Sequence, residues 1–338
     1  MTENLPLFSP NGQRARDLKK EADLSLLGSL MYLLDVFQEG TQVEVKEEIQ
    51  FLNDVAQLRN SAESQLSCMA YVFHDRFLSA IRLQNTEAAR SLIREFSQFS
   101  WISNKPLVGP FLSNCHSPAE WRELGVTLSA AYRTEYQSDF CIKQPSNELT
   151  LKTVDVIGEA LARISASDGE SYDEFEALVT DIVLLASSGV VEGSCFNALG
   201  CIYLSTVEEH QSWVHLVDMI IHETAHHLLY TYWSKAPLIL NDRQGLYNSP
   251  FRTEKRPLSG IYHAMCVLAR TIRILKILER TDSFVNEIKI YYYNDATHSG
   301  VNELEKEFLA TYEIIKRHAD LSGVGKSIME ESREMALA

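Results

Sequence analysis

Two histidines and a glutamate lie in one short segment, HETAHH at 222–227, with the spacing of a metal site. Residues four positions apart lie one above the other on the same face of an α-helix, so the imidazoles of His222 and His226 can meet at one metal ion. Glu223 is turned away by roughly 100° at 3.6 residues per turn and can reach the edge of the metal or a bound water. The motif therefore indicates a metalloenzyme.

The helix that carries this motif is predicted to be buried. Val207–Trp233 reads as one helix, capped by Thr206, with apolar residues almost all round. Histidines and a glutamate would be costly to bury there without partners, and chance would produce the motif with a probability of only roughly a few per cent. The alternative is a set of hydrogen-bonded core histidines. His227 points to another face and is predicted to be structural or to support the ligands.

Two imidazoles rarely complete a metal site, so a third ligand is expected. A metzincin would place a histidine at position 232, where this chain has Tyr232. A thermolysin-like peptidase would supply a glutamate from a later helix, and Glu279 and Glu303 are available, but neither has the flanking residues of that pattern. His263 is the better candidate because it lies in the early turns of a helix predicted over Pro257–Glu279, with proline at its first position. Its alternative role is a core histidine on a packed helix.

These two segments together resemble a known family. HETAH, followed at 249–263 by SPFR-x3-RP-x2-G-x2-H, is similar to the HExxH-type peptide β-hydroxylases associated with modified peptides. The resemblance covers residues 205–275, and the family often has tryptophan where this chain has Phe251. Five residues match the family's downstream histidine, its two arginines and its turn residues: His263, Arg252, Arg256, Pro257 and Gly260.

The resemblance implies an Fe(II)- and 2-oxoglutarate-dependent oxygenase. It would use O2 to hydroxylate the β-carbon of a residue in a ribosomally made precursor peptide. Iron would bind at His222, His226 and His263. Three neutral imidazoles on one side of an octahedral ion leave three positions open. A chelating 2-oxo acid can take two of these positions and O2 the third, so the residues are compatible with what the resemblance implies.

The distal carboxylate of such a cosubstrate needs a cation. Arg252, Lys255 and Arg256 form a positive cluster just ahead of His263 in an acidic chain. Arginine suits bidentate recognition of a carboxylate, so Arg252 and Arg256 are predicted to bind 2-oxoglutarate. The alternative is a solvated charged turn, and Lys255 is predicted to be solvated.

Two other functions are compatible with the motif. In a zinc peptidase, the metal lowers the pKa of its water and Glu223 takes the proton; a strand at Phe196–Thr206 could then align an extended peptide. A peptidase has no evident need for the two arginines. In an oxygenase, Glu223 could hydrogen-bond a ligand or a water. An inert peptide-binding protein with a structural metal would want four ligands, and only three are convincing.

The rest of the chain predicts a mainly α fold, with the buried HExxH helix and possibly a small β-sheet. Residues 1–110 are predicted to form an N-terminal helical lobe, and residues 111–338 the metal-binding catalytic region. Strands are predicted at Phe196–Thr206 and Glu287–Tyr293. Besides the two helices named above, helical periodicity predicts Asp17–Phe37, Ser61–Leu83, Glu87–Phe96, a helix that starts at Ser117-Pro118, Leu149–Ile164 and Tyr172–Ala186.

Composition narrows the class of protein. The 338 residues carry a formal charge of −15, which disfavours nucleic-acid binding because phosphates would be repelled. No segment has the roughly 20 apolar residues of a membrane helix, and no secretory signal is evident. The six cysteines are widely spaced and predicted to be reduced thiols, which favours a cytoplasmic protein.

Overall fold

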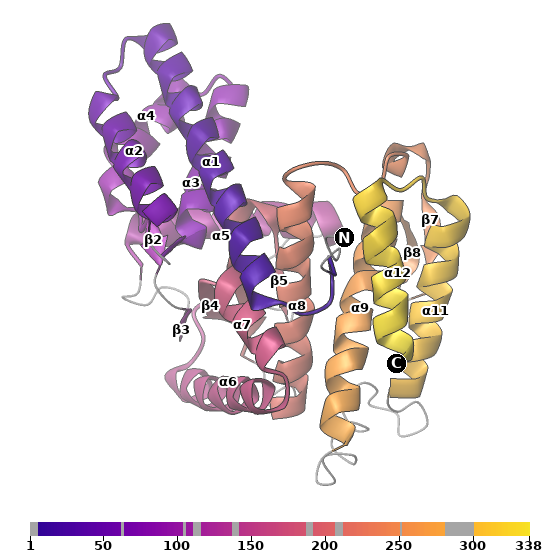
Figure 1. The fold of residues 1–338 in the computed structure, drawn as a ribbon. Helices are drawn as coiled ribbons and strands as arrows, with labels where there is room; N and C mark the ends of the chain where they lie inside the picture. The colour runs from indigo at the N-terminus through magenta and orange to yellow at the C-terminus, as the bar shows by residue number, and fades with distance from the viewer. Residues whose placement is uncertain are drawn as a thin grey trace. The chain divides into compact units, whose positions relative to one another are not determined.

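The chain is mainly helical, with small sheets (Figure 1). The computed structural model describes residues 6–61, 64–103, 106–110, 116–136, 142–186, 192–206, 212–250, 252–280 and 301–338. The predicted fold class is confirmed. The chain forms two compact units: unit 1 is 1–14, 155–175 and 210–338, and unit 2 is 15–154 and 176–209. The division into lobes at residue 110 stays a prediction.

Unit 2 holds the N-terminal helices. They are α1 (Gly12–Thr41, from Ala15 onward), α2 (Lys46–Ser61), α3 (Cys68–Arg82), α4 (Thr86–Arg94), α5 (Pro118–Tyr136) and the first part of α6 (Asn147–Ser167). Asp23 of α1 is fully buried and accepts hydrogen bonds from Arg59 (2.7 Å), Tyr71 (2.7 Å) and the Leu66 amide (3.1 Å), besides its ion pair with Lys19. Because a buried carboxylate is costly without such partners, this network fixes how α1, α2 and α3 meet.

Two sheets belong to unit 2. The larger has the strand order β3 (Leu107–Pro110), β4 (Asp181–Leu185), β6 (Cys201–Ser205) and β5 (Glu192–Ser194). The first three strands are parallel and β5 is antiparallel to β6. Both β4 and β6 are buried along their whole length, and four of the five residues in each, 182–185 and 201–204, are apolar. The smaller sheet pairs β1 (Gln65–Leu66) with β2 (Ile102–Ser103).

Unit 1 is built around two long helices. α8 (Trp213–Trp233) packs on α9 (Leu258–Glu279), and α9 also packs on α11 (Val301–His318) and α12 (Gly323–Leu337). The hairpin of β7 (Tyr247–Ser249) and β8 (Arg252–Arg256) precedes α9. The latter part of α6 and α7 (Gly169–Leu178, up to Phe175) complete the unit together with the N-terminal segment.

The structure corrects three local predictions. Tyr172–Ala186 is not one helix, since α7 ends at Leu178 and Asp181–Leu185 is a buried strand. The cap of α8 is Ser212 rather than Thr206, and Pro257 is the N-cap residue of α9 rather than its first helical residue. These changes leave the motif helices in place.

The other predicted elements are found with shifted ends. The strand predicted at Phe196–Thr206 is a short 3-10 turn, Phe196–Ala198, followed by β6. The helix predicted from Ser61 begins at Cys68, and a short 3-10 turn at Phe96–Gln98 follows α4. The strand predicted at Glu287–Tyr293 lies outside the described residues. No helix within the described ranges combines the length and apolarity that crossing a membrane requires.

Candidate metal centre

The motif helix α8 is buried except along one row. Ser212 caps it by accepting a hydrogen bond from the His215 amide at 3.2 Å. Almost every side chain that follows is buried. The partly exposed ones are spaced by four, apart from the last: Asp218, His222, His226, Tyr230 and Trp233. Since a spacing of four follows one helix face, the helix presents a single open row, and the two motif histidines lie in its middle.

The motif residues form a compact group of potential metal ligands. One ligand atom each from His222, Glu223 and His226 lies within 4.8 Å of the other two. The imidazole centroids of the two histidines are 5.0 Å apart. Glu223 is buried, while both histidines remain partly exposed. The sequence prediction that these three residues come together on the helix therefore agrees with their placement.

His263 lies beside His226. It is the sixth residue of α9, and its Nδ1 atom is 2.9 Å from Nδ1 of His226, with the ring planes inclined by 27°. Two nitrogens bound to one ion at about 2.0–2.1 Å, in adjacent octahedral positions, would be about 3 Å apart. His263 is not one of the three residues of the compact group, and its Nε2 atom is buried without a hydrogen-bond partner. The side chains brought together are of the types that bind a divalent transition metal.

Two of the imidazoles, those of His226 and His263, are kept neutral by their surroundings. Burial lowers the pKa of His226 well below its ordinary value, and His222, His263, His227 and Arg256 lower it further. Burial, followed by the charge of His222, lowers the pKa of His263 to about 4. Neutral imidazole is the form that binds a metal, so these two side chains need not lose a proton at neutral pH before they bind one.

One of the two predicted arginines lies at this site. Arg256 ends β8, pairs with Tyr247 of β7, and lies close enough for its charge to lower the pKa of His226. A Cβ atom at Gly260 would meet Arg256 side-chain atoms from 3.5 Å, so the arginine side chain runs over the first turn of α9. Lys255 is exposed, as predicted. The backbone of Arg252 lies in β8, but its side chain is outside the described residues.

The alternative carboxylate ligands lie elsewhere. Glu279 is the last residue of α9, sixteen positions from His263 and hence about 24 Å along the helix axis. Glu303 on α11 pairs with Lys306. At the position where a metzincin has histidine, Tyr232 donates a hydrogen bond to the Leu7 carbonyl at 2.7 Å. None of these three residues joins the compact group.

Sequence reasoning missed three side chains next to the histidines. Tyr230 and Trp233 contact the imidazoles, with ring centroids 5.5 Å and 5.0 Å from that of His263. Asp218 accepts a hydrogen bond from Thr271 of α9 at 2.8 Å, which ties the two helices together one turn before His222. Extending the spacing of four to either side of the motif would have found Asp218 and Tyr230.

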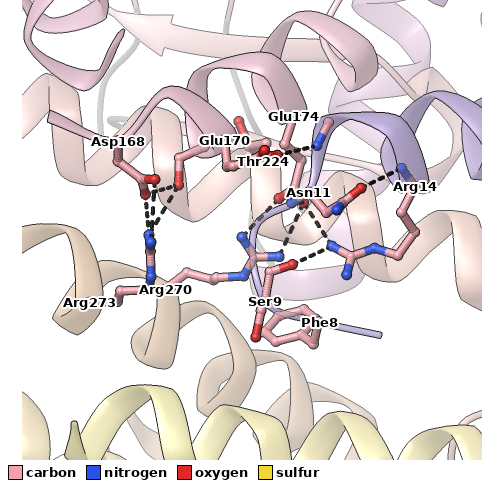
Figure 2. Close-up of polar contacts among 12 residues, drawn as sticks. Phe8, Ser9, Asn11, Arg14, Asp168, Glu170, Glu174, Thr224, Arg270 and Arg273 are labelled. Carbon is pink, nitrogen blue, oxygen red and sulfur yellow. Dashed lines mark hydrogen bonds and ion pairs between the residues drawn. The ribbon is translucent and has the colours of Figure 1, made fainter. Parts of the chain in front are cut away.

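A buried ionic cluster holds α9 in place (Figure 2). Glu174 binds Arg270 of α9 at 2.9 Å and Arg14 at 3.0 Å, and it also accepts the Asn11 amide. Figure 2 shows Arg270 directed at this carboxylate and, one turn on, Arg273 directed at Asp168. Because these groups are largely buried, they fix the position of the helix that carries His263.

Comparison with known proteins does not assign the chain to a family. No family model matches the chain, and no curated protein is significantly similar to it.

Proposed function

We propose that this protein is an Fe(II)- and 2-oxoglutarate-dependent oxygenase that hydroxylates the β-carbon of a residue in a ribosomally made peptide. The observation that carries the proposal is the meeting of three kinds of residue in one place. They are the two motif histidines, a third imidazole 2.9 Å from one of them, and Arg256, whose side chain lies over the first turn of α9 and whose charge lowers the pKa of His226. The resemblance of residues 205–275 to HExxH-type peptide hydroxylases supplies the reaction type.

His222, His226 and His263 would hold the iron. When bound, iron, 2-oxoglutarate and O2 supply the oxidising chemistry that replaces a C–H bond of the peptide with C–OH. The protein keeps His226 and His263 neutral. The rest of α8 is buried, so its open row, which carries His222 and His226, is the face of this helix that a bound group can reach.

The role proposed for Arg256 is to bind the distal carboxylate of 2-oxoglutarate. A guanidinium can form two parallel hydrogen bonds to a carboxylate, and the chain has few other positive charges near the motif in sequence. Arg252 is proposed as the second cation, four positions earlier on β8. Glu223 is proposed to hydrogen-bond a ligand or a water at the metal, since its carboxylate belongs to the compact group.

The proposed substrate is a precursor peptide, and we expect neither nucleic acid nor membrane as a partner. The formal charge of −15 supports this choice because it disfavours polyanionic partners. We also propose that the protein acts in the cytoplasm. Cys68, Cys195, Cys201 and Cys266, the cysteines whose state the described residues give, are free thiols.

The second candidate is a zinc peptidase. It is favoured by the carboxylate of Glu223, which lies near both motif histidines as a general base would. In that case zinc held by the histidines would lower the pKa of its water, and Glu223 would act as the general base. The two hypotheses therefore differ in what this carboxylate does.

The test replaces Glu223 with glutamine. Succinate release is measured in air with Fe(II) and 2-oxoglutarate, with and without a candidate precursor peptide, and the peptide is examined by mass spectrometry. We expect Glu223→Gln to retain measurable succinate release, since no carboxylate base is required when O2 and the 2-oxo acid form the oxidant. In a peptidase the same variant should lose roughly 10²–10⁴-fold in rate with metal still bound.

A mass gain of one oxygen atom on the peptide would support the oxygenase. Peptide fragments that form without O2 or 2-oxoglutarate, and disappear in Glu223→Gln, would overturn it and establish the peptidase.

A further inference from the structure

Two aromatic side chains continue the open row of α8 beyond the histidines. Tyr230 lies four residues after His226, and its ring stacks on that imidazole with centroids 6.0 Å apart and planes inclined by 20°. It also lies 5.5 Å from the ring of His263. Trp233 lies 5.0 Å from the same ring. Of the described aromatic side chains, Tyr230 and Trp233 are those whose rings contact the proposed ligands.

Nearby aromatic residues on the same helix differ in their contacts. Tyr232 is buried, and its hydroxyl is bound to the Leu7 carbonyl. Trp213, at the other end of α8, lies under the guanidinium of Arg163 at 4.0 Å and is also buried. Tyr230 and Trp233 are partly exposed. Tyr230 and Trp233 therefore lie at the candidate metal centre. Tyr232 and Trp213 are aromatic residues of the same helix that can serve as controls.

We propose that Tyr230 and Trp233 are a site of oxidative self-modification, the first groups oxidised when O2 is consumed without peptide. The proposal rests on the oxygenase function. Iron held by His222, His226 and His263, with 2-oxoglutarate and O2, would supply an oxidant that acts on a peptide C–H bond when substrate is bound. When substrate is absent, the electron-rich rings in contact with the proposed ligands, among the described side chains, are these two. Closure over a substrate normally suppresses such side reactions.

The reaction balances with the cosubstrates already named. One aromatic C–H bond becomes C–OH, and the oxygen comes from O2. The other oxygen atom of O2 enters the succinate carboxylate formed when 2-oxoglutarate loses CO2. The ring and the 2-oxo acid are each oxidised by two electrons, and these four electrons reduce O2. The products are a hydroxylated tyrosine or tryptophan, succinate and CO2.

Oxidation of these rings should protect the histidines of the proposed metal site. Tyr230 lies against His226 and His263, and Trp233 lies against His263. Because an oxidant that has reacted with one of these rings is consumed, it no longer reacts with the imidazoles proposed to hold the metal. We therefore expect a Tyr230→Leu/Trp233→Leu variant to acquire oxygen on His226 or His263 instead, and to lose metal several-fold faster during turnover without peptide.

The main experiment uses the wild-type full chain and requires no substitution. The protein is incubated with Fe(II), 2-oxoglutarate and isotopically labelled O2, digested, and mapped by tandem mass spectrometry. We expect one labelled oxygen atom on Tyr230 or Trp233, and none on Tyr232 or Trp213. The labelling should require 2-oxoglutarate and fall when a peptide substrate is added.

A second measurement does not depend on turnover. Co(II) is titrated into the protein and tryptophan fluorescence is recorded. Because Trp233 contacts His263, we expect the ion to quench its emission, so that Trp233→Phe loses most of the Co(II)-dependent signal. Trp213→Phe is the matched control on the same helix and should keep it. A signal unchanged in Trp233→Phe would remove this residue from the metal centre.

The outcomes separate the two proposals. Succinate release without labelled oxygen on Tyr230 or Trp233, or with equal labelling of Tyr232 and Trp213, would overturn the self-modification and leave the oxygenase intact. Absence of succinate under all conditions, with Fe(II) bound, would overturn the oxygenase and this inference with it.

Discussion

A nitrogen–nitrogen separation of 2.9 Å between His226 and His263 has two chemical meanings. In a core pair, one neutral ring donates a hydrogen bond to the other. In a metal centre, both nitrogens direct lone pairs at one ion. The lowered pKa values of both rings are compatible with either meaning, since burial favours neutral imidazole in each case. Only the metal centre requires His222 as well, and this requirement can be tested one residue at a time.

Loss of any one imidazole should abolish metal binding. We expect wild-type protein, purified without oxygen, to bind stoichiometric Fe(II), and His222→Ala, His226→Ala and His263→Ala each to lose it. The measurement is metal content after gel filtration. Glu279→Ala is the matched control for His263→Ala, because it lies on the same helix but about 24 Å away along the axis. Full metal content in His263→Ala, with loss in Glu279→Ala or Glu303→Ala, would show that a carboxylate is the third ligand.

Arg256 should determine affinity for 2-oxoglutarate but not for metal. We expect Arg256→Ala to weaken 2-oxoglutarate binding by roughly 2–5 kcal/mol, the range for removing one partner of a buried charge pair. Arg252→Ala should have an effect of similar size. Calorimetry on Mn(II)-loaded protein measures both. The control is Lys255→Ala, since adjacent strand residues point to opposite faces and Lys255 is exposed. Equal affinity in all four proteins would exclude the arginines from the cosubstrate site.

At the scale of elements, the geometry of the candidate metal centre depends on how α9 is held. Arg270 lies two turns after His263 and forms an ion pair with Glu174, whose side chain is only 2% exposed. Breaking a buried ion pair costs roughly 3–5 kcal/mol, because it leaves an uncompensated charge. We therefore expect Glu174→Gln to lower the free energy of unfolding by that amount and to weaken metal binding through misplaced His263.

Denaturant unfolding and metal titration measure these two effects. Glu170→Gln is the matched control: it lies on the same helix and accepts only the Gly12 amide in the described contacts, at 3.1 Å, from an exposed position. Its effect should be within about 0.5 kcal/mol, as for most surface changes. Equal destabilisation by the two variants would show that the pair with Arg270 contributes little to the position of α9.

The motif helices could be predicted because their signals are local. A spacing of four, an apolar surrounding and a proline before a periodic segment identified α8 and α9 and the residues on them. The strand at Asp181–Leu185 was predicted as helix, since five consecutive apolar or buried positions have no period that separates a buried strand from a buried helix. The helices α2, α11 and α12 were not predicted; their mixed apolar and charged sequences gave weaker signals.

Contacts between distant segments could not be predicted. Glu174 and Arg270 are 96 positions apart, and nothing in either segment indicates the other. The neighbourhood of Trp233 and His263 likewise depends on how α8 and α9 cross, which side-chain packing decides. The sequence thus located the proposed ligands, whereas the contacts of Tyr230 and Trp233 and the ionic cluster around Glu174 required the structure.

At the scale of the whole molecule, two histidines in unit 2, one buried and one half-buried, respond to pH in opposite directions. His116 lies between Asp181, at 2.8 Å, and Glu120, at 3.7 Å. Burial lowers the pKa of His116, but hydrogen bonds and charges from these carboxylates outweigh it and raise the pKa to about 10. Burial, followed by the charge of Arg82, lowers the pKa of His74 to about 4.

The sign of each contribution follows from which state binds more protons. Between its unfolded pKa of roughly 6.5 and about 10, His116 is protonated in the folded state and neutral in the unfolded state. Its contribution to the free energy of unfolding therefore has its full size below the unfolded-state pKa and is lost as pH rises through about 10. For His74 the unfolded state binds more protons between about 4 and the unfolded value, so stability falls as pH drops through that range.

We expect His116→Gln to lower the free energy of unfolding at pH 6 by about 3–5 kcal/mol, because it leaves two buried carboxylates without their cation. The difference in free energy of unfolding from wild type should shrink as pH rises from about 7 to 10, the window in which folded His116 holds a proton that the unfolded chain has lost. His74→Gln is the control, and its pH dependence should have the opposite sign. Below about pH 6.5 wild type loses free energy of unfolding because unfolded His74 binds a proton, and the variant does not, so the variant gains stability relative to wild type only in that range. Chemical denaturation of the metal-free full chain at a series of pH values measures all three proteins. If the free energy of unfolding of His116→Gln is lower than that of wild type by the same amount from pH 6 to 10, the imidazole is neutral between Asp181 and Glu120. The ion pairs then do not stabilise unit 2.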